Sequence, residues 1–126
     1  VVLEAYAREG TDDLIVFRDN YNNIWYHIKG QSHHLASAYL VSQAKIVDGV
    51  SYILALNRDL DQALLYMNGY KYLLNPPLRD DEYMSWRGLM RRYGNDVYVL
   101  TNTWGNHSQI YKRNEPIDMS ARIELR

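Results

Sequence analysis

Two short runs of strand-forming residues joined by an asparagine-rich turn constrain the fold of this chain more than any other feature. Residues 14–19 and 24–29 are rich in β-branched and aromatic side chains, and residues 20–23 between them read Asn-Tyr-Asn-Asn. Asparagine tolerates the left-handed backbone that a tight turn requires, so the pattern predicts a β-hairpin. Because side chains alternate along a strand, its two faces carry Ile24, Tyr26 and Ile28 on one side and Trp25, His27 and Lys29 on the other.

Further strands are expected on both sides of this hairpin. Residues 1–8 predict a strand that precedes a glycine turn. Residues 50–56 are apolar at successive positions, which is typical of a strand buried on both faces and makes it the candidate central strand. Near the end of the chain, residues 96–103, residues 109–113 and the strictly alternating residues 117–126 predict three more strands.

Three other segments have apolar residues at the three- and four-residue spacing of a helix face. They are residues 32–48, which Ser32 would cap, residues 59–74, and residues 80–93, which an acidic start and a final glycine delimit. The expected fold class is therefore α+β, with an antiparallel or mixed sheet packed against about three helices. We expect a single domain over residues 1–126, and no internal repeat is evident in the sequence.

Composition excludes several classes of function. The chain is 47% apolar and 23% charged, which is ordinary for a globular protein and unlike a disordered one. Its formal net charge of −1 argues against nonspecific nucleic-acid binding. It has no cysteine, so disulfides, thiolate metal sites and a cysteine nucleophile are excluded, and a cytoplasmic location is weakly favoured. No apolar stretch is long enough to predict a membrane partner.

The aromatic residues point to binding. The sequence has twelve tyrosines and three tryptophans but one phenylalanine, and tyrosine suits half-wet contact surfaces because its large ring carries a hydroxyl. We therefore expect a non-enzymatic protein that engages another protein or associates with itself. The predicted binding residues are Trp25, Tyr66, Tyr70, Tyr72, Trp86, Arg87, Arg91 and Trp104. In this set Tyr66 and Tyr70 stand one helical turn apart on the expected second helix.

Two alternatives stay open. A small ribonuclease or RNA-binding protein would use His27, His107 and Arg113 as base, acid and charge stabiliser. Arg87 and Arg91 beside an aromatic ring would suit phosphates and stacked bases. A domain that binds a small ligand in a tyrosine-lined pocket is the other alternative.

Motifs for cofactors and metals are absent from the sequence. The glycines form neither a GxGxxG pattern nor a P-loop, and the serines form no GxSxG elbow. His33 and His34 are adjacent in the expected first turn of a helix, so their side chains point about 100° apart and do not form a chelating pair. We therefore expect no cofactor and no metal site, and the balance leans away from an enzyme.

Overall fold

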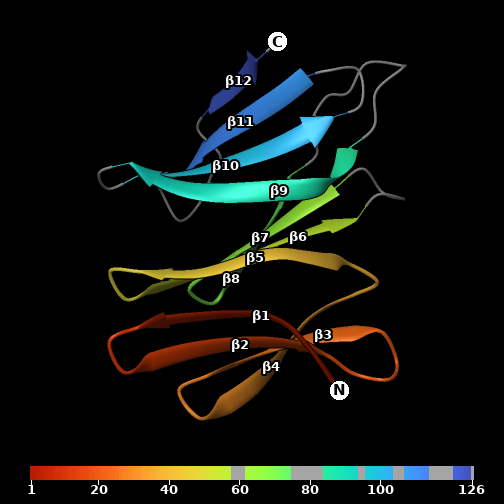
Figure 1. The fold of residues 1–126 in the computed structure, drawn as a ribbon, viewed down its shortest axis with the longest axis vertical. Coiled ribbons are helices and arrows are strands. Elements are labelled where there is room, and N and C mark those ends of the chain that lie inside the picture. Colours follow the sequence, from red (N-terminus) through yellow and green to blue (C-terminus); the bar gives the residue numbers. More distant parts are fainter. Residues whose placement is uncertain (58–61, 75–83, 94–95, 104–106, 114–120, 126) are drawn as a thin grey trace.

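A computed structural model describes residues 1–57, 62–74, 84–93, 96–103, 107–113 and 121–125, with side chains at residues 1–57 and 63–73. Every regular element in these ranges is a β-strand (Figure 1). The strands form three four-stranded sheets, and each sheet is an antiparallel meander in which neighbours in sequence are neighbours in space. We call them the first, second and third sheets.

The strand bounds follow the chain without a crossover. The first sheet contains β1 (Val2–Glu9), β2 (Asp12–Arg18), β3 (Asn23–Ile28) and β4 (Gln31–Ser37). The second contains β5 (Leu40–Val47), β6 (Val50–Asn57), β7 (Gln62–Met67) and β8 (Tyr70–Leu74). The third contains β9 (Met84–Tyr93), β10 (Asp96–Thr103), β11 (His107–Arg113) and β12 (Ala121–Leu125).

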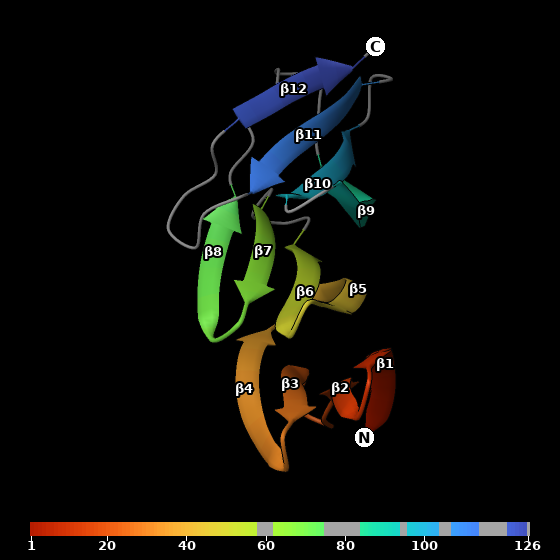
Figure 2. The same ribbon diagram turned by 90° about the vertical axis from the view of Figure 1, so that its left-hand side faces the viewer.

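The three sheets are stacked as successive layers, with the second between the other two (Figures 1 and 2). Strand β1 lies beside β5, and β5 and β6 lie beside β9. The first strand of each sheet therefore faces the first strand of the next. This order gives the second sheet a neighbour on both faces and the first sheet a neighbour on one.

The predicted α+β class is wrong, because no helix is present among the described residues. The expected helix at residues 32–48 is instead β4 and β5, and the one at residues 59–74 contains β7 and β8. Most of the expected helix at residues 80–93 is β9. Short apolar runs fit both a helix face and a buried strand, and pairing between strands decided the outcome.

The predicted hairpin and central strand are confirmed. Strands β2 and β3 pair antiparallel, with Val16 opposite Tyr26. Ile24 and Tyr26 are buried, as expected for the inward face. Strand β6 is buried from Ser51 to Asn57, consistent with its position between two other sheets.

A structural repeat that the sequence did not reveal links the first two sheets. The bulge between Leu3 and Ala5 in β1 recurs between Val41 and Gln43 in β5, 38 residues along the chain (3 to 41). The first hairpin of each sheet closes at the same offset. The expectation of no internal repeat is therefore wrong at the level of structure.

Three hairpins close with two residues of positive φ. The pairs are Lys29-Gly30, Asp48-Gly49 and Asn68-Gly69, with φ between 46° and 97°. Positive φ at both central residues matches the right-handed twist of the flanking strands and favours glycine at the second position. These glycines end no helix, contrary to the expectation for Gly49.

Two apolar cores lie on opposite faces of the second sheet. Ile53, Ala55, Leu64 and Tyr66 belong to the core shared with the first sheet, where the rings of Tyr26 and Tyr66 lie 4.5 Å apart. Burial and a hydrogen bond with Tyr66 raise the pKa of the Tyr26 hydroxyl. The opposite face carries the other core, made of Tyr52, Leu54, Leu56, Ala63, Leu65 and Met67.

Polar contacts also join the first two sheets. The Glu9 carboxylate at the end of β1 accepts hydrogen bonds from the backbone N–H groups of Asp48 and Gly49, at 2.8 and 2.7 Å. At the opposite edge of the two sheets, the Lys71 ammonium of β8 donates a hydrogen bond to the Leu35 carbonyl of β4 at 2.8 Å. These contacts tie a turn and an edge strand of the second sheet to the first sheet. Throughout the described ranges, no helix has the length and apolarity needed to cross a membrane.

Candidate protein-binding face

The first sheet has an outer face that points away from the second sheet. Residues directly opposite each other in an antiparallel pair share a face, so the pairing defines this surface. One row across β1 to β4 is Leu3, Phe17, Trp25 and His34. The next row is Tyr6, Ile15, His27 and Ser32, and a third begins with Arg8 and Asp13. We call these ten residues the outer face.

The apolar residues of the outer face are most exposed on edge strand β1. Leu3 is 62% exposed and Tyr6 is 51% exposed, whereas Ile15, Phe17 and Trp25 are partly covered by their neighbours on the sheet. The inward face of the same strands is closed, because Leu14 and Val16 are fully buried. Apolar side chains that stay partly or largely exposed on one face of a sheet indicate a candidate interaction site.

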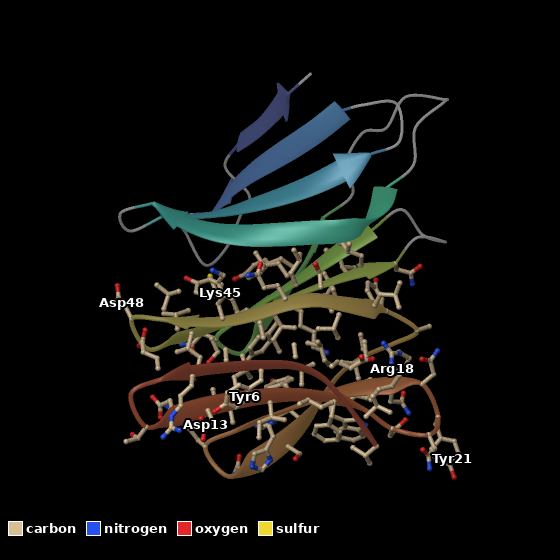
Figure 3. The ribbon with its side chains drawn as sticks, in the orientation of Figure 1. Tyr6, Asp13, Arg18, Tyr21, Lys45 and Asp48 are labelled. Carbon is tan, nitrogen blue, oxygen red and sulfur yellow. The ribbon has the colours of Figure 1, made fainter. Side chains whose placement is uncertain are left out.

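A polar group borders the apolar centre at the open end of β1. The Tyr6 hydroxyl donates to Asp13 Oδ1 at 2.7 Å, and Arg8 Nε lies 3.5 Å from the same oxygen. Figure 3 shows Tyr6 beside Asp13 on the first sheet. The hydrogen bond to the carboxylate raises the pKa of the Tyr6 hydroxyl, so this tyrosine stays neutral and keeps its ring on the face.

Side-chain contacts fix the aromatic residues at the other end. The rings of Trp25 and His34 meet edge to face, with centroids 5.3 Å apart. Trp25 Nε1 donates to Asp19 Oδ2 at 2.9 Å, which holds the indole at the edge of the turn between β2 and β3. His27 Nδ1 lies 2.9 Å from the Ser32 hydroxyl. The face is thus held in one arrangement before any partner arrives, which lowers the entropy cost of binding.

Asp19 organises the turn that supports Trp25. Besides the indole bond, its carboxylate accepts hydrogen bonds from the backbone N–H groups of Tyr21 and Asn23 and from the Asn23 side chain. The Trp25 bond and then these turn bonds lower the pKa of Asp19 from its ordinary 3.8 to about 2. The ionised carboxylate is therefore the form that stabilises the fold.

This lowered pKa predicts an acid-dependent loss of stability. The Asp19 contribution is complete above its unfolded pKa near 3.8 and is lost as the pH falls through about 2. Asp19→Asn should therefore lower the free energy of unfolding at pH 6 and flatten its decline between pH 4 and about 2. Urea titrations across that range measure both effects. Asp12→Asn, the same charge change at the exposed start of β2, is the matched control, and equal flattening in both variants would contradict the role of Asp19.

Through the structural repeat, residues of the outer face have equivalent positions in the second sheet, and there these positions are covered by another sheet. Counting from the equivalent turns, Ile15 and Phe17 correspond to Ile53 and Ala55 of β6, which are fully buried under the first sheet. In the following hairpin, Trp25 and His27 correspond to Leu64 and Tyr66, each 4% exposed. In the second sheet, the positions that form the outer face of the first sheet belong to a sheet-to-sheet core.

The structure places the predicted binding residues on different sheets and with different exposure to solvent. Trp25 lies on the outer face as expected, on the side of β3 opposite Ile24 and Tyr26. Tyr66 is buried between two sheets, so the structure does not offer it for binding. Tyr70 is 64% exposed on β8, and Tyr72 is partly buried against the second core. The expected helical pairing of Tyr66 with Tyr70 is wrong, because a hairpin turn separates them.

The residues of the ribonuclease alternative lie on different sheets. His27 is on β3 of the first sheet, whereas His107 and Arg113 are the two ends of β11 in the third sheet. The second sheet lies between them (Figure 1). The fold therefore does not bring these three positions to one cleft. Among the residues with described side chains, no group of three or more potential ligands is placed to hold a metal ion.

The remaining predicted residues lie beyond the described side chains. Trp86, Arg87 and Arg91 belong to strand β9, so the cationic helix face expected for them does not exist. Trp104 lies outside the described residues.

Several residues of the outer face were not predicted from the sequence as binding residues. Leu3, Ile15 and Phe17 were part of predicted strands but were not assigned to a surface, and Tyr6 was not among the predicted binding residues. One sequence signal could have identified them. Ile15 and Phe17 alternate with Leu14 and Val16, so this strand is apolar on both of its faces. A strand of this composition at the end of a stack leaves one apolar side uncovered.

Comparison with protein-family models, with curated proteins and with solved structures gives no match for this chain.

Proposed function

We propose that this protein is a non-enzymatic binding domain and that the outer face of the first sheet is where it engages another protein. The observation that carries the proposal is the repeat correspondence. The same positions are buried in a sheet-to-sheet core in the second sheet and are partly exposed in the first. Exposed apolar surface costs free energy in water, about 25 cal/mol for each Å², and a partner that covers it recovers that energy.

The chemistry of the outer face fits a protein partner. Its apolar part holds Ile15, Phe17 and Trp25 on the two inner strands and Leu3 on edge strand β1, and its border holds the charged pair Arg8 and Asp13. An apolar and aromatic centre with a polar border is the usual anatomy of a protein interface. Tryptophan and tyrosine near such a centre supply much of the binding energy.

The test uses binders selected against the folded protein from a phage-displayed peptide library. We expect the dominant binders to lose affinity for Leu3→Glu by about 30-fold, since a charge buried against apolar side chains of a partner is costly. Leu73→Glu is the matched control, because Leu73 is similarly exposed, at 57%, but lies on β8 of the second sheet. Affinities are measured by interferometry. Binders that tolerate Leu3→Glu but lose affinity for Leu73→Glu would contradict the proposal.

A further inference from the structure

The turn between β7 and β8 carries a chemically labile pair of residues. Asn68 and Gly69 form this turn, and Asn68 is the only asparagine in the chain that a glycine follows. The side-chain carbonyl carbon of an asparagine can be attacked by the backbone nitrogen of the next residue. Glycine obstructs this attack least, because it has no Cβ atom. Asparagine is accordingly among the residues that limit the lifetime of proteins at high temperature.

The surroundings of this turn leave the reacting groups accessible. Asn68 and Gly69 are both exposed, and a Cβ atom added to Gly69 would meet no other atom within 4 Å. The backbone N–H of Asn68 donates to the Ser51 carbonyl at 2.9 Å, which holds the turn beside the start of β6. Within the part of the chain that the structure describes, neither the Asn68 side-chain amide nor the Gly69 N–H has a hydrogen-bond partner.

The turn between β5 and β6 shows how the same chemistry is blocked. Asp48-Gly49 also has positive φ at both residues, and an aspartate before a glycine undergoes the same ring closure. There the Gly49 N–H donates to Glu9 Oε1 at 2.7 Å. The carboxylate keeps the proton on this nitrogen and directs the N–H toward the first sheet. Among the described residues, no carboxylate has this role at Gly69.

We infer that Asn68 is a site of spontaneous deamidation, which the fold leaves unprotected while it protects Asp48-Gly49. The Gly69 nitrogen gives up its proton and forms a bond to Cγ of Asn68, and the Cγ–N bond of the side-chain amide breaks and releases ammonia. Water then opens the resulting five-membered imide at either of its two carbonyl carbons. One opening gives aspartate. The other gives isoaspartate, in which the main chain runs through the side-chain carbon atoms. This site is separate from the outer face of the first sheet.

The two products affect the hairpin differently. Aspartate keeps the length of the main chain, and Asp48 shows that a turn of this kind accepts an aspartate as its first residue. Isoaspartate adds one carbon atom to the main chain, within a turn that sets Met67 opposite Tyr70. Strand β8 of this hairpin also holds Lys71, which bonds to the Leu35 carbonyl of the first sheet. The isoaspartate form should therefore have a weakened β8 edge and a lower free energy of unfolding.

Ageing of the folded protein tests the inference. The protein is held at pH 8 and 37 °C beside a synthetic peptide with the sequence of residues 66–72, and peptide mapping by mass spectrometry follows each asparagine. Conversion of the amide to an acid adds one dalton, and chromatography separates aspartate from isoaspartate. We expect Asn68 in the folded protein to convert within about tenfold of the peptide rate, and at least about tenfold faster than any other asparagine. No conversion at Asn68 while the peptide converts, or equal conversion at several asparagines, would overturn the inference.

Asn68→Gly is the matched control for the consequence of the modification. This variant keeps the positive φ of the turn available and lacks the reacting side chain. After ageing, the parent protein should unfold at a lower urea concentration than before, whereas Asn68→Gly should be unchanged. An equal loss of stability in both proteins would contradict the role of Asn68.

Glu9→Ala tests the protection of the equivalent turn. Loss of the carboxylate frees the Gly49 N–H, so isoaspartate at Asp48 should form about tenfold faster or more, the equivalent of one hydrogen bond to a charged group. Circular dichroism establishes that the variant keeps its strands. An unchanged rate at Asp48 in the folded variant would overturn the protective role of Glu9.

Discussion

Ile53→Ala lowers the free energy of unfolding by about 2 to 5 kcal/mol, whereas Ile15→Ala costs about 1 kcal/mol or less in dilute protein. The two isoleucines occupy the same position of the structural repeat, one on β6 and one on β2. Ile53 is fully buried between the first two sheets, and its truncation leaves a cavity in a packed core. Ile15 lies on the outer face, where water already reaches it.

Urea denaturation monitored by circular dichroism gives both values. The protein is kept dilute, so that association through the outer face does not add to the stability of either variant. Equal costs for the two substitutions in dilute protein would show that the outer face is already covered within one chain.

Gly69→Ala lowers the free energy of unfolding by about 1 to 2 kcal/mol through the backbone alone. Gly69 has φ +97°, in the left-handed region that residues with a Cβ atom adopt at a cost. An added Cβ there meets no other atom within 4 Å, so crowding contributes nothing. The hairpin that this turn closes holds Met67 opposite Tyr70.

The control for that substitution lies in the same turn. Asn68→Gly removes the strain of a residue with a Cβ atom at φ 46°, which stabilises the folded state. It also gives the unfolded chain more conformational freedom, which favours unfolding, so the two effects oppose each other. We expect a change within about 0.5 kcal/mol, measured by the same urea titrations. A harmless Gly69→Ala would contradict the left-handed geometry of the turn.

The hairpin at residues 14–29 and the strand at residues 50–56 were predictable because their signals are local. Alternating apolar residues beside an asparagine-rich turn specify a hairpin, and a run that is apolar on both sides specifies a buried strand. In both segments the pairing partners agree with the local preference. The burial of Ile24 and Tyr26 followed directly from this alternation.

The helices were predicted wrongly because the turn signals were given the wrong meaning. Asp48-Gly49 and Asn68-Gly69 are sequences that favour two-residue hairpin turns, and the structure places positive φ at all four residues. Gly49 was instead interpreted as the end of one helix and Gly69 as a weak point within another. The pairing of β5 with β6 and of β7 with β8 was therefore not predicted. With the turns assigned correctly, their spacing would also have suggested the repeat.

The binding face could be anticipated only in part. The alternation of β3 placed Trp25 on the side opposite the core. Whether that side is exposed to solvent depends on whether another sheet packs on it, and the local sequence of β3 does not determine this. Tyr66 shows the converse, because it occupies the position equivalent to His27 and is buried only because another sheet lies over it.

The solvent access of Trp25 tests the central claim most directly. Trp86→Phe with Trp104→Phe leaves Trp25 as the sole tryptophan, and circular dichroism establishes that the double variant keeps the strand content of the parent. Acrylamide quenching is then measured for the free protein and for its complex with a selected binder that lacks tryptophan. The account predicts weaker quenching and a blue-shifted emission on binding. Unchanged quenching in a complex of proven stoichiometry would contradict the assignment of the outer face as the binding surface.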